Sequence, residues 1–201
     1  PFLTIALYGL VVLLVGSFRF WRDTRGSLAD VVDFGAFWKA TQDAFGLSYL
    51  KGGGVGCNYP DAAFSQARRW LHHLVFYGFL LDFASTTIAA FYDHFLDWVA
   101  PYPLLSWPVV LGTLGGIGLL TGTSGLLYLK WRSDREPAEQ RMLNMDVAFL
   151  ILLFLSSATG MLLLALRESP AMGTLLVVHL GVVAGVFLTA PYGKFAHAVY
   201  R

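Results

Sequence analysis

The stretch from Thr174 to Tyr200 reads TLLVVHLGVVAGVFLTAPYGKFAHAVY, and the interpretation of the remaining sequence depends on it. It overlaps a run, residues 169–193, that contains no Asp, Glu, Lys or Arg, and a run of this length can cross a bilayer as one helix. His179 and His197 are 18 residues apart, which on a continuous helix is five turns and about 27 Å. We therefore expect both imidazoles on one helix face, one near each membrane surface.

Two histidines in one apolar helix suggest a ligand-binding role. A single intramembrane histidine is usually a core residue with a hydrogen-bonded ring, because an unpartnered one is costly in lipid. Neutral imidazole is also the commonest metal ligand in proteins. Two histidines on one face, one near each surface, have the layout with which a helical membrane cytochrome holds one haem near each side. This interpretation requires a second helix with matching histidines.

The composition is that of a membrane protein. Of the 201 residues, 56% are hydrophobic and 13% are charged, well away from the usage of soluble globular proteins. The net charge of +1 suggests no nucleic-acid partner. Cys57 is the single cysteine, which excludes an internal disulfide and an iron–sulfur cluster held within this chain. The chain begins with Pro1 instead of Met, as expected of a fragment or a processed product.

Apolar runs separated by charged segments predict an all-α, polytopic membrane helical bundle. Five transmembrane helices are expected, at about residues 2–18, 70–98, 109–129, 147–166 and 173–200. Residues 27–50 follow helical spacing, and Ser27 with Asp30 resembles a capping box, so we expect one amphipathic helix at the membrane interface. Residues 1–201 are expected to form a single haem-binding transmembrane domain.

The predicted second span carries the matching histidines. His72 and His73 lie at its start and His94 near its end, and either of the first two is within about 60° of His94 around a helix. If this helix runs antiparallel to the last one, His72 or His73 faces His197 at one surface, while His94 faces His179 at the other. Two bis-histidine haem sites are therefore expected. Because no Cys-x-x-Cys-His is present, both would hold non-covalent haem b.

The basic residues determine the expected topology. If the segment from Arg19 to Arg69 lies inside, five spans place 13 of the 14 Lys and Arg residues on the inner side and only Arg167 outside. The carboxyl terminus is then cytoplasmic. The haem site that includes His197 becomes the inner site, and the one that includes His179 becomes the outer site.

Basic side chains at these two heights are candidates for pairing with haem propionates. Arg68, Arg69 and Lys194 are expected at the height of the inner haem, either as propionate partners or as ordinary anchors at the inner surface. Arg167 lies beside the start of the last helix, so we expect it to neutralise a propionate of the outer haem.

Further polar and aromatic residues are candidates for function. Asp82 lies at mid-membrane depth, where an ionisable group is a functional candidate by default; the alternative is a protonated acid bonded to Ser85 or Thr86. Tyr102 and Trp107 are expected at the outer interface, either as part of an aromatic belt or near a quinone. Four glycines between residues 112 and 118 allow a helix or a flat macrocycle to pack closely against the third span.

Residues 52–201 resemble the membrane domain of the tricarballylate/citrate utilization protein B family in the segments GGGVGCNYP, RRWLHHLVFYGFLLDFAST, APYPLLSWPVVLGTLGGIGLL and HLGVVAGVFLTAPYGKFAHAVYR. More distantly, the last helix resembles that of the nitrate reductase gamma subunit, where two histidines supply ligands to two b haems. That resemblance maps the first ligand of the second helix to His73, followed by Gly78. The other ligand of that helix would fall near Phe83, where no histidine is present, so His94 takes over its role.

The resemblance implies a di-haem b-type membrane cytochrome in the bacterial inner membrane. Such a protein reoxidises a soluble flavoprotein dehydrogenase of tricarballylate or citrate utilization and passes the electrons to quinone. The family also carries a ferredoxin-like domain with iron–sulfur clusters ahead of the matched region. The implied partners are therefore the flavoprotein, the ferredoxin-like iron–sulfur domain, quinone and membrane lipid.

Two other classes of function remain open. A proton-coupled transporter could use intramembrane His and Asp side chains as a relay, without histidines paired in height on two helices. A simple membrane anchor for a dehydrogenase needs no histidines. A membrane metalloprotease is excluded because it needs an H-E-x-x-H helix, which the sequence lacks.

Overall fold

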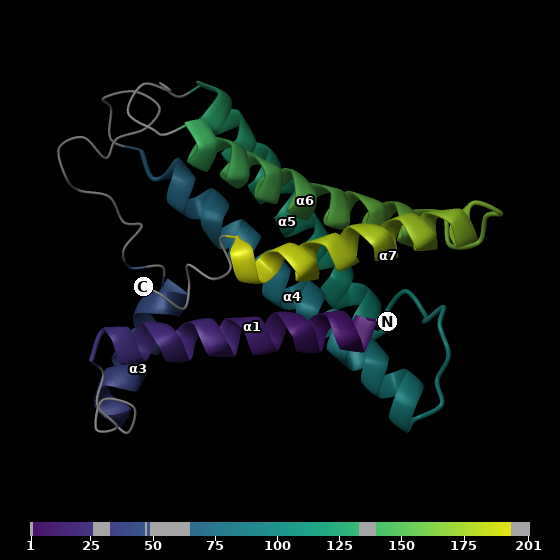
Figure 1. Ribbon diagram of the computed structural model, residues 1–201. Coiled ribbons are helices and arrows are strands. Elements are labelled where there is room, and N and C mark those ends of the chain that lie inside the picture. The colour runs from purple at the N-terminus through teal and green to yellow at the C-terminus, as the bar shows by residue number, and fades with distance from the viewer. Residues whose placement is uncertain (1, 26–32, 47, 49–64, 133–139, 194–201) are drawn as a thin grey trace.

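The computed structural model describes residues 2–25, 33–46, 48, 65–132 and 140–193. In this part of the chain the elements are α1 (Phe2–Asp23), α3 (Phe34–Gly46), α4 (Ala67–Phe95), α5 (Trp107–Arg132), α6 (Gln140–Ala165), α7 (Met172–Thr189) and the 3₁₀ turn η2 (Ala190–Tyr192) (Figure 1). The helices α1, α4, α5, α6 and α7 are long and apolar enough to cross a membrane. The predicted all-α fold, with five transmembrane helices and one interfacial helix, is confirmed.

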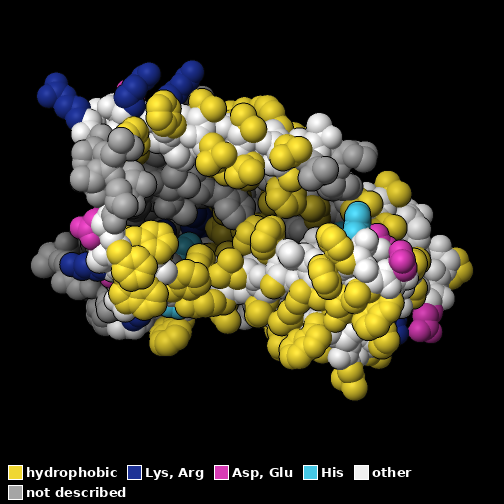
Figure 2. Space-filling model, turned by 90° about the horizontal axis from the view of Figure 1, so that it is seen from below, with side chains coloured by type: hydrophobic (Ala, Val, Ile, Leu, Met, Phe, Trp, Pro, Cys, Tyr) yellow, Lys and Arg dark blue, Asp and Glu magenta, His cyan; other side chains and the backbone are white. Residues whose placement is uncertain are grey.

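The transmembrane helices pack as a row. In that row α4 packs on α5, α5 on α6, α6 on α7 and α7 on α1. Figure 1 shows that α4 and α7 run in opposite senses, as expected from the sequence. Figure 2 shows most of the described Lys and Arg side chains at one end of the molecule, which is the distribution that the predicted topology requires.

Apolar side chains cover most of the outer surface. Leu14 is 59% exposed, Val177 71% and Leu105 92%, and hydrophobic side chains spread over the face shown in Figure 2. Exposed apolar surface of this extent marks contact with another apolar phase. Together with five helices of spanning length, it identifies a multi-pass membrane protein whose outward side chains contact lipid.

The contact between α4 and α5 depends on glycine. A Cβ atom added at Gly78 would lie 2.8 Å from the backbone nitrogen of Leu119 and 2.9 Å from the carbonyl oxygen of Gly115. A Cβ atom added at Gly122 on α5 would lie 2.8 Å from the carbonyl oxygen of Leu71. Small residues allow helix backbones to touch in this way, which strengthens packing in lipid. The glycines between residues 112 and 118 therefore serve helix packing, because α4 and α6 cover them.

A partly buried ion pair explains why α6 starts earlier than predicted. The sequence predicts a span from residue 147, whereas α6 begins at Gln140. The Nζ atom of Lys130 on α5 lies 2.9 Å from Oδ2 of Asp146 on α6, and their side chains are only 13% and 23% exposed. Because the two charges are paired, both side chains can lie within helices near the membrane surface.

The interfacial helix is shorter than predicted. It was expected over residues 27–50, and the structure has α3 from Phe34 to Gly46. Asp33 caps it, since its Oδ1 accepts a hydrogen bond from the backbone N–H of Ala36 at 3.0 Å. The proposed capping residues Ser27 and Asp30 lie outside the described part of the chain.

The last helix ends before its predicted boundary. We expected one helix over residues 173–200, but α7 ends at Thr189 and is followed by the 3₁₀ turn, after which Gly193 is extended. Pro191 has no N–H to continue the α-helical pattern. The expectation of one continuous helix is therefore wrong, and the five-turn relation between His179 and His197 does not follow from it.

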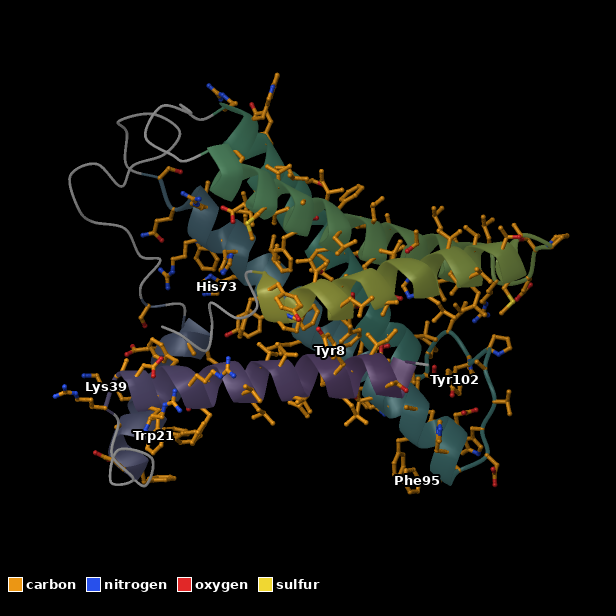
Figure 3. The ribbon with its side chains drawn as sticks, in the orientation of Figure 1. Tyr8, Trp21, Lys39, His73, Phe95 and Tyr102 are labelled. Atoms are coloured by element: carbon orange, nitrogen blue, oxygen red, sulfur yellow. The ribbon has the colours of Figure 1, made fainter. Side chains whose placement is uncertain are left out.

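The turn after α7 is attached to α1. The hydroxyl groups of Tyr8 and Tyr192 are hydrogen-bonded to each other, and Figure 3 shows Tyr8 on the side of α1 that faces the end of α7. A Cβ atom added at Gly9 would lie 3.4 Å from the carbonyl oxygen of Phe187. These contacts position the end of the last span against the first.

Replacing Gly78 with Leu should destabilise the bundle strongly. Its Cβ alone would meet the α5 backbone at 2.8 Å, so the helices must separate, at a cost of about 1–3 kcal/mol or more. Thermal unfolding in detergent, followed by circular dichroism, measures the loss. Gly181→Leu is the matched control on α7, because nothing lies within 4 Å of a Cβ atom there. Equal destabilisation by both substitutions would contradict the packing described here.

Candidate functional site

The predicted ligand His73 lies in the first turns of α4 (Figure 3). Its Nδ1 atom is 2.9 Å from the carbonyl oxygen of Arg69. A carbonyl can only accept, so Nδ1 carries the hydrogen and Nε2 keeps a free lone pair. The ring lies between those of Trp70 and Tyr77, with centroids 5.6 Å and 6.0 Å away. The orientation of His73 is thus set by one hydrogen bond and two aromatic neighbours.

His72, the alternative ligand at this end, is held less firmly. It is exposed, whereas His73 is half-buried. It forms no hydrogen bond to another described residue, in contrast to His73. The structure therefore favours His73 as the side chain prepared for a ligand role.

His94 lies in the last turn of α4. Its Nδ1 atom is 3.0 Å from the carbonyl oxygen of Ala90 and 3.4 Å from Oδ2 of Asp93. Both partners are acceptors, so Nδ1 again carries the hydrogen. The side chain is 71% exposed, which leaves Nε2 open to a ligand.

His179 lies on α7 and faces α6. Its Nδ1 atom is 2.9 Å from Oγ1 of Thr159. A Cβ atom added at Gly160 would be 3.1 Å from Cε1 of the imidazole, so this glycine leaves the space that the ring occupies. His179 is half-buried.

The three described ligand candidates share one chemical feature. In His73, His94 and His179 the Nδ1 atom is hydrogen-bonded to an oxygen. Where the oxygen accepts, such a bond places the hydrogen on Nδ1 and leaves the lone pair of Nε2 free, the arrangement that is usual for metal-bound histidine. The described residues contain no cluster of three or more His, Cys, Asp or Glu side chains for a metal ion. A haem iron needs only two, since the macrocycle supplies the rest, and this donor set fits such a group.

The structure does not bring the predicted partners into direct contact. No hydrogen bond or ring contact joins His73, His94 and His179 to one another. His197 and Lys194 lie outside the described residues, so the inner pair His73–His197 stays a prediction. The same holds for the outer pair His94–His179.

The basic candidates already have partners in the protein. Arg69 donates through Nη2 to the carbonyl oxygen of Gly46 at 3.4 Å, and its guanidinium lies 5.9 Å from the centroid of Trp70. Arg167 donates through Nη1 to the carbonyl oxygen of Tyr102 at 2.9 Å. Their pairing with propionates, like that of Arg68, stays a prediction.

The sequence matches the family described as Citrate utilization protein B over residues 2–201. The chain belongs to the citrate utilization protein B family. It is 46% identical over 199 residues to the Citrate utilization protein B of Escherichia coli, a match that covers 98% of this chain and 52% of that protein. The chain thus spans about half the length of this curated relative. No solved structure matches it.

The family match extends further than the resemblance found in the sequence. That resemblance covered residues 52–201, whereas the family match begins at residue 2. It therefore includes α1 and α3. The first span and the interfacial helix are part of the citrate utilization protein B region and not an unrelated leader to it.

The alternative interpretation of Asp82, a protonated acid bonded to Ser85 or Thr86, is not what the structure shows. The Ser85 hydroxyl donates to the carbonyl oxygen of Pro108 at 2.6 Å, and the Thr86 hydroxyl to the backbone carbonyl of Asp82 at 3.0 Å. Neither reaches the Asp82 carboxyl group, which lies against Gly115. That alternative is wrong because Ser and Thr in a helix readily bond to a backbone carbonyl of their own or a neighbouring helix.

Aromatic residues line an open hollow of about 560 Å³ at the end of the bundle where α4 finishes and α5 begins. Its walls include Tyr92, Trp98, Tyr102 and Trp107. The Tyr102 hydroxyl donates to the carbonyl oxygens of Ala89 and Trp98 at 3.0 and 3.1 Å. Partial burial, followed by the nearby carboxylate of Asp93, raises the pKa of Tyr102. The sequence singled out Tyr102 and Trp107 but not the two other aromatic residues.

Thr159 and Gly160 were also missed. In the sequence they lie in an ordinary apolar span, and no spacing rule relates them to His179. The α6–α7 contact alone shows their role. A role that depends on contact with a neighbouring helix can be recognised only from the tertiary structure.

Replacing His73 with Ala should remove one haem, whereas replacing His72 should not. The reason is that His73 is oriented by the Arg69 carbonyl and by two rings. Haem per chain, measured as the pyridine haemochrome, should fall from about two to about one in His73→Ala. His72→Ala is the matched control and should keep the wild-type value. Loss of a haem from His72→Ala alone would show that the neighbouring histidine is the ligand.

Proposed function

We propose that this chain is a di-haem b-type cytochrome of the bacterial inner membrane. It would carry electrons from a cytoplasmic flavoprotein and iron–sulfur dehydrogenase of tricarballylate or citrate utilization to the quinone pool. It would then be the quinone-reducing membrane part of an oxidoreductase. Membership of the citrate utilization protein B family supports the pathway, and five helices of spanning length support the membrane location.

The observation that carries this proposal is the hydrogen bonding shared by three of the four described histidines. Polar side chains within a membrane are rare and mark functional sites. His73, His94 and His179 each use Nδ1 in a hydrogen bond and leave Nε2 free. The bond satisfies the imidazole N–H of each ring, and it also leaves the lone pair of Nε2 available, as in the histidines that bind metals.

The proposed ligand sets are His73 with His197 at the inner site and His94 with His179 at the outer site. When bound, haem b supplies a one-electron carrier at each site. The basic residues proposed to hold propionates are Arg68, Arg69 and Lys194 at the inner site and Arg167 at the outer site. The protein orients the imidazoles and keeps the sites within the bundle.

The inner end is the proposed entry point for electrons. Interfacial helix α3 is joined to α4 there, since the Tyr77 hydroxyl donates to the carbonyl oxygen of Phe45 at 2.7 Å. The ring of Tyr77 also stacks on His73. Most of the described Lys and Arg side chains gather at this end (Figure 2), and they offer a charged docking face for a cytoplasmic partner.

A reduced-minus-oxidised visible spectrum of the purified chain tests the proposal. It should show non-covalent b-type haem, at about two per chain, as two bis-histidine sites require. The haem should be extracted by acidic acetone, because no Cys-x-x-Cys-His attaches it. A correctly folded preparation without colour would overturn the proposal and favour the transporter or the anchor.

The order of electron flow is tested with His197→Ala. This change should remove the inner haem and leave the outer one bound, because the two sites use different histidines. Stopped-flow reduction by the dehydrogenase partner should then reduce the outer haem much more slowly than in the wild type. His72→Ala, which alters a histidine of the same end, is the control and should keep the wild-type rate. An unchanged rate in His197→Ala would mean that electrons enter at the outer end.

A further inference from the structure

The hydrogen bond of His179 differs from those of the other two ligand candidates. His73 and His94 each bond to a backbone carbonyl four residues earlier in the same helix. His179, on α7, bonds instead to the Thr159 hydroxyl on α6, with 2.9 Å between Nδ1 and Oγ1. The orientation of this ring therefore depends on a side chain of another helix.

The hydrogen of the Thr159 hydroxyl is already used. Oγ1 donates to the carbonyl oxygen of Leu155 at 2.7 Å and lies 3.1 Å from that of Ser156. A hydroxyl group has one hydrogen and two lone pairs. Towards His179 it can therefore only accept, so Nδ1 must be the donor. This chain of bonds leaves Nε2 of His179 without a hydrogen.

The residue after Thr159 makes room for the ring. A Cβ atom added at Gly160 would lie 3.1 Å from Cε1 and 3.6 Å from Nδ1 of His179, but 3.9 Å from Nε2. Cε1, the carbon between the two ring nitrogens, is thus the atom nearest to Gly160. A side chain at this position would push the ring off α6.

We infer that Thr159 is a positioning residue for a haem ligand. It holds His179 in the tautomer that leaves Nε2 without a hydrogen and fixes the orientation of the ring. An acceptor on Nδ1 also makes an imidazole a stronger donor to iron, which stabilises the oxidised state and lowers the midpoint potential. This inference rests on the proposed function, because it concerns the haem bound by His179.

Redox titration of the full chain in detergent, read by visible spectra and by electron paramagnetic resonance, tests the inference. In Thr159→Val the shape is kept and the acceptor is lost, so the potential of one haem should rise while the other stays unchanged. Thr159→Ser should restore the wild-type value. The haem that shifts should be the one lost in His179→Ala.

The matched control is Thr113→Val. Thr113 also lies within a span and donates to a carbonyl of its own helix, that of Val109, at 2.7 Å, but it bonds to no described histidine. The Thr113→Val variant should leave the midpoint potentials of both haems unchanged. The inference is overturned if Thr159→Val binds both haems and keeps the wild-type potentials and resonance signals. The proposed function would still stand in that case.

Two further results keep the test decisive. A wild-type chain without haem at the His179 site would refute the proposed function, and this is seen before any variant is made. If Thr159→Val does not fold, Gly160→Ala provides the second test, since its Cβ would press on the ring at 3.1 Å and leave the hydroxyl in place. It should alter the resonance signal of the same haem, and no change would overturn the inference.

Discussion

The close contact between α4 and α5 is the constraint on which the candidate site depends. Gly78 on α4 lies against the backbone at Gly115 and Leu119, and any larger side chain would separate the two helices. Because His73 and His94 lie at opposite ends of α4, this contact places both ends of the site relative to the rest of the bundle. In lipid, where apolar burial gives helices little reason to associate, such backbone contact is a main source of helix–helix affinity.

Hydrogen bonding then determines what the histidines can do. A neutral imidazole within a membrane has to place its N–H group against an acceptor, and His73, His94 and His179 do so through Nδ1. The same bond that makes the ring tolerable in lipid leaves Nε2 available to iron. A single interaction therefore serves both the stability of the spanning helices and the proposed chemistry, so the two cannot be altered independently.

The two ends of the bundle are built differently. At the end that carries most of the described basic side chains, α3 is attached to α4 next to His73 through Tyr77 and Phe45. At the other end, Arg167 is bonded to the connection between α4 and α5, beside the aromatic hollow. The first end is therefore the charged one, where the docking of a water-soluble partner is proposed, and the second is the aromatic one.

The sequence by itself determined the class of fold and the candidate ligands. Long uncharged runs allow only spanning helices, because backbone polar groups in lipid must bond within the helix, and histidines within such runs stand out by type alone. Only the tertiary structure decided where α7 ends and that the Ser85 hydroxyl bonds to a backbone carbonyl and not to Asp82. It alone also showed that Thr159 and Gly160 contact His179. Periodicity reports which residues share a face of one helix, but a contact between helices depends on how their axes approach, and local sequence does not encode that.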